Sequence, residues 1–153
     1  FILTFVSAIA SALVAGIFFA FSTFIMAALG RIPAEQGIAA MQSINITVIN
    51  PLFMLAFMGT GVLCLMLIAG AYVRWDETGG KLILLASLIY LIGCIGVTMV
   101  FNVPLNNALA ALQPATSEAA ALWTRYLQEW TFWNHVRTVA PIVSAALFIW
   151  ALL

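Results

Sequence analysis

The chain has 153 residues, of which 65% are hydrophobic and 7% are charged, and its five basic residues balance its five acidic ones. Soluble domains have about half apolar and a quarter charged residues, so this composition indicates a polytopic membrane protein with one domain, residues 1–153. The zero net charge argues against a nucleic-acid partner, because such proteins need a basic surface to displace counterions from phosphates.

Four apolar segments are predicted to cross a bilayer as helices, which takes about 20 residues each. They are residues 2–29, 51–73, 81–101 and 137–153. The first is interpreted as a retained span rather than a cleaved signal peptide, and because it starts at Phe1 we expect a longer parent chain. Small residues such as Gly61 and Gly93 would let neighbouring helices approach closely.

The connections between these spans differ in character. In residues 33–48 apolar side chains recur at three- and four-residue steps, and residues 116–136 begin with capping and acidic residues. Both segments are predicted to be amphipathic interfacial helices. Residues 74–80 are a short charged turn, so the second and third spans should be antiparallel neighbours.

The predicted fold class is therefore all-α: an integral membrane four-helix bundle. An even number of spans places both termini on one side and the first and third connections together on the other. The Lys and Arg residues are spread over both sides, so they do not fix the orientation in the membrane.

Polar side chains concentrate between residues 102 and 138. Asn102 and Asn106 are four residues apart and would share a helix face, where their amides could hold a carbonyl or phenol oxygen. Alternatively they satisfy backbone carbonyls freed by Pro104. His135 is the only histidine, the residue type best suited to proton transfer near neutral pH. Arg137 begins the fourth span, and an arginine there is a functional candidate by default.

The aromatic residues of this stretch have two interpretations. Trp123, Tyr126, Trp130 and Trp133 could form a belt at the bilayer surface, or some of these rings could line a pocket for an aromatic substrate. One His and no HExxH or CxxC motif predict no metal site, although a haem with one His and one Met ligand stays open. No glycine-rich phosphate loop is present, which argues against a nucleotide cofactor.

Cys64 and Cys94 fall within apolar runs, where a thiol behaves as a small hydrophobe. A redox pair is the alternative if their helices are neighbours, but no flanking polar residue would activate either thiol.

Four stretches carry a family resemblance: AGIFFAFSTFIMAALGRIP, AMQSINITVINPLFMLAFMGTG, NVPLNNAL and WTRYLQEWTFWNHVRT. In this order they resemble the small membrane-protein family that contains the anthrone oxygenases, over nearly the whole chain, and NVPLN and WNHVRT are the most specific pieces. The resemblance implies a four-helix membrane bundle. It also implies oxidation of anthrones to anthraquinones by dioxygen without a metal or organic cofactor, although most bacterial members have no assigned substrate.

This activity would assign roles to the polar residues. His135 would remove a proton from the anthrone methylene carbon, and Arg137 and Asn102 would stabilise the resulting enolate oxygen. The residues predicted to bind substrate are Asn45, Asn106, Trp130, Trp133 and Asn134.

The expected partners are a lipophilic aromatic molecule, dioxygen and membrane lipid, in a bacterial cytoplasmic membrane and with no cofactor. A homo-oligomer is left open. The alternative function is a non-enzymatic integral membrane protein, either a small-molecule binder or a subunit that packs against a partner.

Overall fold

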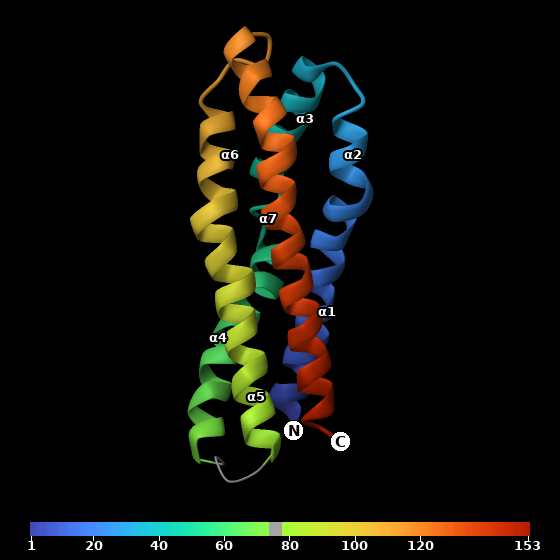
Figure 1. Cartoon of the computed structure of the whole chain (residues 1–153). Coiled ribbons are helices and arrows are strands. Elements are labelled where there is room, and N and C mark those ends of the chain that lie inside the picture. Colours follow the sequence, from blue (N-terminus) through green and yellow to red (C-terminus); the bar gives the residue numbers. More distant parts are fainter. Residues whose placement is uncertain (74–77) are drawn as a thin grey trace.

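The computed structural model describes residues 1–73 and 78–153, and this part of the chain is helical throughout apart from short connections (Figure 1). Its elements are, in chain order, α1 (Ile2–Ala20), the π-helical turn η1 (Phe21–Ile25), α2 (Met26–Leu29), α3 (Ala34–Thr47), α4 (Pro51–Val73), α5 (Thr78–Ile89), the π-helical turns η2 (Tyr90–Gly96) and η3 (Thr98–Asn102), α6 (Val103–Ala110) and α7 (Ser117–Trp150).

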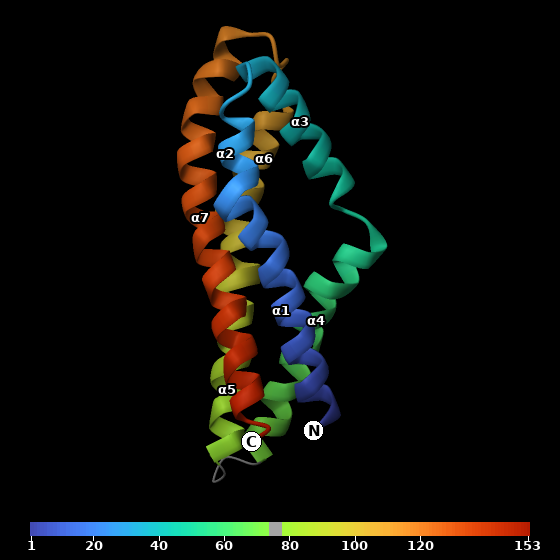
Figure 2. The same cartoon turned by 90° about the vertical axis from the view of Figure 1, so that its right-hand side faces the viewer.

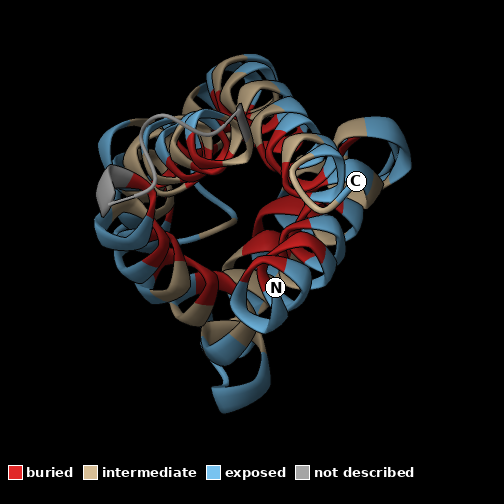
Figure 3. Ribbon diagram, turned by 90° about the horizontal axis from the view of Figure 1, so that it is seen from below, coloured by how far each residue is buried: buried red, intermediate tan, exposed pale blue. Residues whose placement is uncertain are grey.

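Three helical stretches of the described residues are long and apolar enough to cross a membrane. They are Ile2–Leu29, Pro51–Ala71 and Gly79–Ala110. Large apolar side chains cover the outer surface, while the buried faces point inward (Figure 3). The interior also contains hydroxyl and amide side chains and Arg137. An apolar exterior around a partly polar interior is typical of membrane proteins.

The long helix α7 runs without interruption through the predicted interfacial helix at 116–136 and most of the predicted span at 137–153. Thr116 caps its start, accepting a hydrogen bond from the Ala119 amide at 3.2 Å. Pro141 lies inside the helix and is fully buried. It removes one backbone donor without ending the helix, because packing on both sides holds the chain in place.

The helices run lengthwise beside α7, which contacts α1 and α5 most extensively (Figure 1). Both termini lie at one end of the molecule, and the connections before α3 and before α7 lie together at the other end. This arrangement agrees with the predicted placement of the termini and connections. Residues 74–77 of the predicted charged turn lie outside the described residues.

Between α3 and α4 the chain forms an elbow at residues 48–50, which projects sideways about halfway along the molecule (Figure 2). Asn50 stabilises the bend: its Oδ1 accepts a hydrogen bond from the Phe53 amide at 3.1 Å, and its Nδ2 donates to the Thr47 carbonyl at 3.1 Å. Pro51 then starts α4, where its missing N–H is not needed. Because of this bend, α3 and α4 do not continue as one straight rod.

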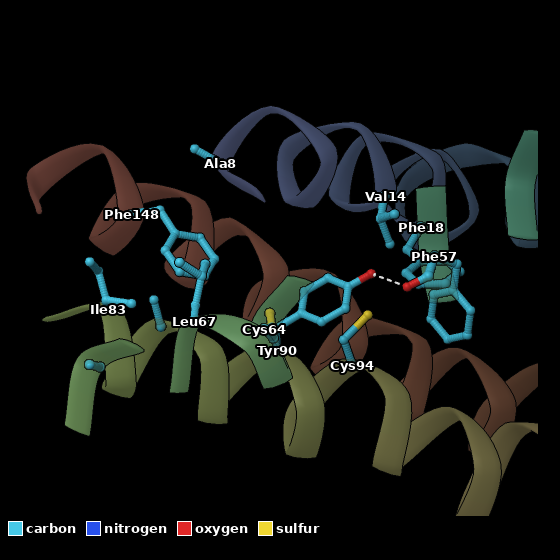
Figure 4. Packing of buried hydrophobic residues seen from close by; sticks show 12 residues of the cluster. Ala8, Val14, Phe18, Phe57, Cys64, Leu67, Ile83, Tyr90, Cys94 and Phe148 are labelled. Carbon is cyan, nitrogen blue, oxygen red and sulfur yellow. Dashed lines mark hydrogen bonds between the residues drawn. The ribbon is translucent and has the colours of Figure 1, made fainter. Parts of the chain in front are cut away.

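The apolar core has two parts. The part nearer the termini packs Phe148 of α7 against residues of α1, α4 and α5, with the Tyr90 hydroxyl donating to the Phe57 carbonyl at 2.9 Å (Figure 4). The part nearer the connections packs Trp123, Tyr126 and Trp130 of α7 against α2, α3 and α6. The polar residues described next lie between these two parts.

Candidate functional site

One buried face of α7 carries the candidate site. Trp123, Tyr126, Trp130, Asn134 and Arg137 recur at three- and four-residue steps, and all are less than a tenth exposed. The first three rings stack in succession, with centroids 5.5 Å and 5.7 Å apart. These aromatic residues face the protein interior and therefore do not form a lipid-facing belt.

Arg137 is held by hydrogen bonds and by aromatic rings. Its Nε donates to Asn134 Oδ1 at 3.0 Å, and one terminal nitrogen lies 3.4 Å from Thr98 Oγ1. The guanidinium carbon is 4.2 Å from the centroid of the Phe18 ring and 4.7 Å from that of Trp130. Cation–π contacts of this kind stabilise a guanidinium that has lost its water.

No carboxylate in the described part of the chain pairs with Arg137; Arg125 and Glu129, on the outer surface of α7, form an ion pair at 2.7 Å. A buried cation without a carboxylate partner is expensive, and such groups mark ligand sites. The local structure therefore supplies partial compensation and leaves the positive charge available to a ligand.

The π-helical turns provide the partners that fix this arrangement. Ser22 of η1 accepts a hydrogen bond from Asn134 Nδ2 at 2.7 Å, and the same nitrogen donates to the Phe18 carbonyl at 2.8 Å. Thr98 of η3 donates to the Cys94 carbonyl at 2.7 Å, so its remaining lone pair faces Arg137. π-Helical turns often occur at functional sites because they redirect side chains within a helix.

Asn106 connects the aromatic ladder to α6. Its Oδ1 accepts hydrogen bonds from the Tyr126 hydroxyl at 2.7 Å and from Trp130 Nε1 at 2.8 Å. An indole nitrogen can only donate, so this contact fixes which end of the amide is oxygen. Nδ2 of Asn106 has no hydrogen-bond partner in residues 1–73 and 78–153 and remains available as a donor.

A cavity of about 240 Å³ adjoins these groups. Most of its wall is apolar, with Phe, Met, Ile and Val side chains from α1, α3, α4 and the elbow. The polar and charged side chains in its wall are Asn45, Thr98, Asn106 and Arg137, together with the indole of Trp130. Asn45 also reaches the ladder, with its Nδ2 3.5 Å from the Tyr126 hydroxyl. The cavity thus combines an aromatic and aliphatic body with one polar side, as small-molecule sites commonly do.

The polar side of the cavity favours an oxygen that carries negative charge. Arg137 Nη2 and Asn106 Nδ2 are donors without a protein partner among the described residues, and no carboxylate lines the wall. Asn45 Oδ1 offers an acceptor nearby. The two donors suit an enolate or carbonyl oxygen on one part of a ligand, and the acceptor suits a hydroxyl on another part.

Four of the residues expected at a site line this cavity: Asn45, Asn106, Trp130 and Arg137. Asn134 does not line it but holds Arg137 in place. Asn102 is fully buried, and its Nδ2 donates to the Trp130 carbonyl at 3.1 Å while its Oδ1 has no partner in the described structure. Asn102 therefore supports α7 at the level of Trp130.

The other two predicted residues lie elsewhere. His135 is exposed and does not line the cavity, because it is one position after the inward-facing Asn134. Trp133 stacks on Phe101, with ring centroids 3.5 Å apart, and is likewise outside the cavity wall. The base role suggested for His135 receives no support from this placement.

Sequence reasoning did not assign Thr98, Ser22 or Phe18 to the site. Thr98 could have been found, since it precedes Asn102 by one helical turn on the same face. Ser22 has the small side chain typical of helix contacts in membranes, which by itself does not indicate a site. The sequence gives no sign that Phe18 contacts the site, because it is one of several Phe residues in a uniformly apolar helix.

No cluster of three or more His, Cys, Asp or Glu residues occurs in the described ranges. Cys64 and Cys94 are both buried and free, on either side of the Tyr90 ring in the core (Figure 4).

A family model described as anthrone oxygenase matches residues 53–147, which include the cavity-lining residues of α4, η3, α6 and α7. Searches of curated proteins and of solved structures returned no match.

Proposed function

Because the chain belongs to the anthrone oxygenase family, we propose that it is an integral membrane oxygenase that uses dioxygen to oxidise a lipophilic polycyclic phenol. In this proposal the three apolar helical stretches and α7 form a four-helix bundle in a bacterial cytoplasmic membrane. The reaction takes place in the cavity beside Arg137 without a metal or organic cofactor.

The observation that carries the proposal is the buried Arg137 on the wall of an otherwise apolar cavity. A planar aromatic ligand fits between the Phe and Met side chains of α1, α3 and α4. Its oxygen can accept hydrogen bonds from Arg137 and Asn106, and a second hydroxyl can donate to Asn45. In a mostly apolar cavity these interactions are stronger than in bulk water, so they favour the ionised form of the ligand.

Ionisation prepares such a substrate for oxygen. An anthrone that loses a proton from its methylene carbon becomes an enolate, whose electron-rich ring can pass one electron to dioxygen. The carbon and the reduced oxygen then combine to form a C–O bond and a peroxide. Loss of the remaining hydrogen on that carbon, with cleavage of the O–O bond, gives the quinone carbonyl and one molecule of water.

In this scheme the substrate supplies the electrons, and the protein supplies the charge that stabilises the enolate. No proton transfer is assigned to His135, because its side chain is outside the cavity. A water molecule that enters the cavity with the substrate accepts the proton, since a fixed positive charge next to the oxygen makes the anthrone methylene more acidic.

The test is oxygen uptake by the purified protein in lipid nanodiscs supplied with emodin anthrone. The proposal expects one dioxygen consumed per anthrone, at a rate well above that of empty nanodiscs. Oxidation no faster than in empty nanodiscs would contradict it.

A second candidate function is a non-enzymatic binder of lipophilic phenols. It is favoured by one observation: the described wall of the cavity contains no carboxylate or histidine that could act as a base. Saturable binding of emodin without faster anthrone oxidation would establish this alternative.

A further inference from the structure

The cavity changes from buried to exposed along its length. At its inner end Phe57 and Arg137 are 5% and 6% exposed. At its outer end Ile49, Met58 and Met99 are 71%, 42% and 57% exposed. We call these three outer residues the mouth. The cavity is therefore open to the surroundings on one side.

The mouth lies where the elbow interrupts the wall of helices. Ile49 belongs to the elbow, Met58 to α4 and Met99 to η3. Residues 48–50 leave the helical path and project sideways (Figure 2). Val48 and Ile49 of this elbow line the cavity.

The mouth is far from the charged ends of the molecule. Thr98, next to Met99, contacts Arg137, so the mouth is at the depth of Arg137. Arg137 follows Glu129 by eight residues, or about 12 Å of helix, and Met99 follows Lys81 by about 27 Å at 1.5 Å per residue. The hydrocarbon layer of a bilayer is about 30 Å thick, so an opening at this depth faces acyl chains rather than water.

From these observations we propose that the ligand reaches Arg137 sideways, out of the hydrocarbon layer, through the mouth formed by Ile49, Met58 and Met99. This inference rests on the proposed function for the identity of the ligand, a lipophilic phenol. All three mouth side chains are apolar and offer no hydrogen bond to a hydrated solute. A ligand dissolved in the membrane loses little on entering, and it gains its polar contacts only at the inner end.

The route can be tested with emodin, the coloured anthraquinone, which requires no turnover. Association and dissociation rates are measured by stopped-flow quenching of protein fluorescence in nanodiscs. Met58→Trp and Met99→Trp narrow the mouth, whereas Val62→Trp and Val100→Trp place the same ring on neighbouring exposed positions that do not line the cavity. Because an added Trp also fluoresces, each variant is compared by rate rather than by signal amplitude.

A gate at the mouth slows entry and exit together. We expect each mouth variant to lower both rates by about tenfold, with the dissociation constant changed less than about twofold, while both control variants keep wild-type rates. Wild-type association rates in both mouth variants, or equal slowing in the controls, would overturn the route.

A second arm distinguishes entry from lipid and entry from water. In liposomes loaded with emodin anthrone at a fixed ratio to lipid, the initial rate per protein should not change when the suspension is diluted with buffer. A rate that falls in proportion to dilution would overturn entry from the bilayer.

The two proposals can fail separately. Emodin binding with gated rates but no oxygen uptake would remove the oxygenase function and keep the route. Oxygen uptake by the wild type, with wild-type emodin association rates in both mouth variants, would keep the oxygenase function and remove the route. Wild-type protein that binds no emodin, with a lipid acyl chain occupying the cavity instead, would contradict both.

Discussion

Arg137 is the residue on which the proposed chemistry depends. Asn134 and Thr98 orient it, Phe18 and Trp130 cover its faces, and no described carboxylate neutralises it. The protein thus stabilises a buried cation well enough to fold while leaving its charge uncompensated. An anionic oxygen of the ligand completes the arrangement.

Replacing Arg137 with Gln removes the charge and keeps a hydrogen-bonding side chain. We expect the rate of anthrone oxidation to fall by about 10²- to 10³-fold, as for loss of an oxyanion donor. Arg125→Gln is the matched control, because that arginine is exposed and pairs with Glu129 on the outer surface of α7. Oxygen uptake in nanodiscs is the measurement, and equal activity of the two variants would refute the role of Arg137.

His135 is expected to be dispensable. His135→Ala should retain oxygen uptake within about twofold of wild type, whereas loss of a general base would lower it by about 10²-fold or more. If a folded His135→Ala protein lost most of its oxygen uptake, this prediction would be wrong. His135 would then have to reach the substrate from a position other than the exposed one described above.

Asn106 should contribute to stability as well as to binding. Asn106→Leu leaves the buried Tyr126 hydroxyl and Trp130 Nε1 without their shared acceptor, at a cost of about 1–3 kcal/mol per unsatisfied group. Asn107→Leu, at the exposed neighbouring position, is the control. Thermal unfolding in detergent should show a lower midpoint for the first variant alone; matching midpoints would argue against this role.

At the scale of elements, three interruptions of regular helix shape the site. The π-helical turns η1 and η3 bring Ser22 and Thr98 to α7, and the elbow at residues 48–50 lines the adjoining cavity. Pro104 contributes to the π-helical turn η3. Because proline has no N–H, the carbonyl of Val100 loses its helical hydrogen bond and the preceding turn is less constrained. Uninterrupted α-helices would pack more closely here and leave less room.

Close helix contact elsewhere depends on small residues. A Cβ added to Gly93 would lie 2.6 Å from the Ala140 Cβ, so the α7 helix could not keep its present distance. Gly93→Val should therefore destabilise the protein by about 1–3 kcal/mol. Gly16→Val is the control, because nothing lies within 4 Å of the added Cβ there. Similar thermal midpoints for the two variants would contradict this packing.

The sequence predicted the helical class, three of the four apolar spans and the grouping of termini and connections, because length and hydropathy determine them. It also placed Arg137, Asn106, Trp130 and Asn45 among the site residues, since polar groups inside apolar helices are rare. It could not predict that His135 and Trp133 lie outside the cavity wall. Neighbouring residues on a helix differ by about 100° in direction, and only the packing of α7 fixes which face is buried. The π-helical turns and the elbow also left no clear periodic signal.

For the whole molecule, the proposed membrane topology makes a labelling prediction. Cysteines introduced at Glu35 and Glu118, which are exposed at the connection end, should react with an impermeant maleimide from the same side of the membrane. A cysteine at Leu153, at the opposite end, should react only from the other side. The native Cys64 and Cys94 are buried and should add little background. Labelling of all three positions from one side would exclude the topology.

The most direct test of the account follows the oxygen atom itself. Wild-type protein in nanodiscs is given emodin anthrone under oxygen-18 gas for a time in which empty nanodiscs convert little substrate, and the quinone is analysed by mass spectrometry. We expect rapid formation of quinone carrying one labelled oxygen, with the rate for Arg137→Gln close to the protein-free rate. Quinone formed at the same rate with wild type, Arg137→Gln and empty nanodiscs would contradict it.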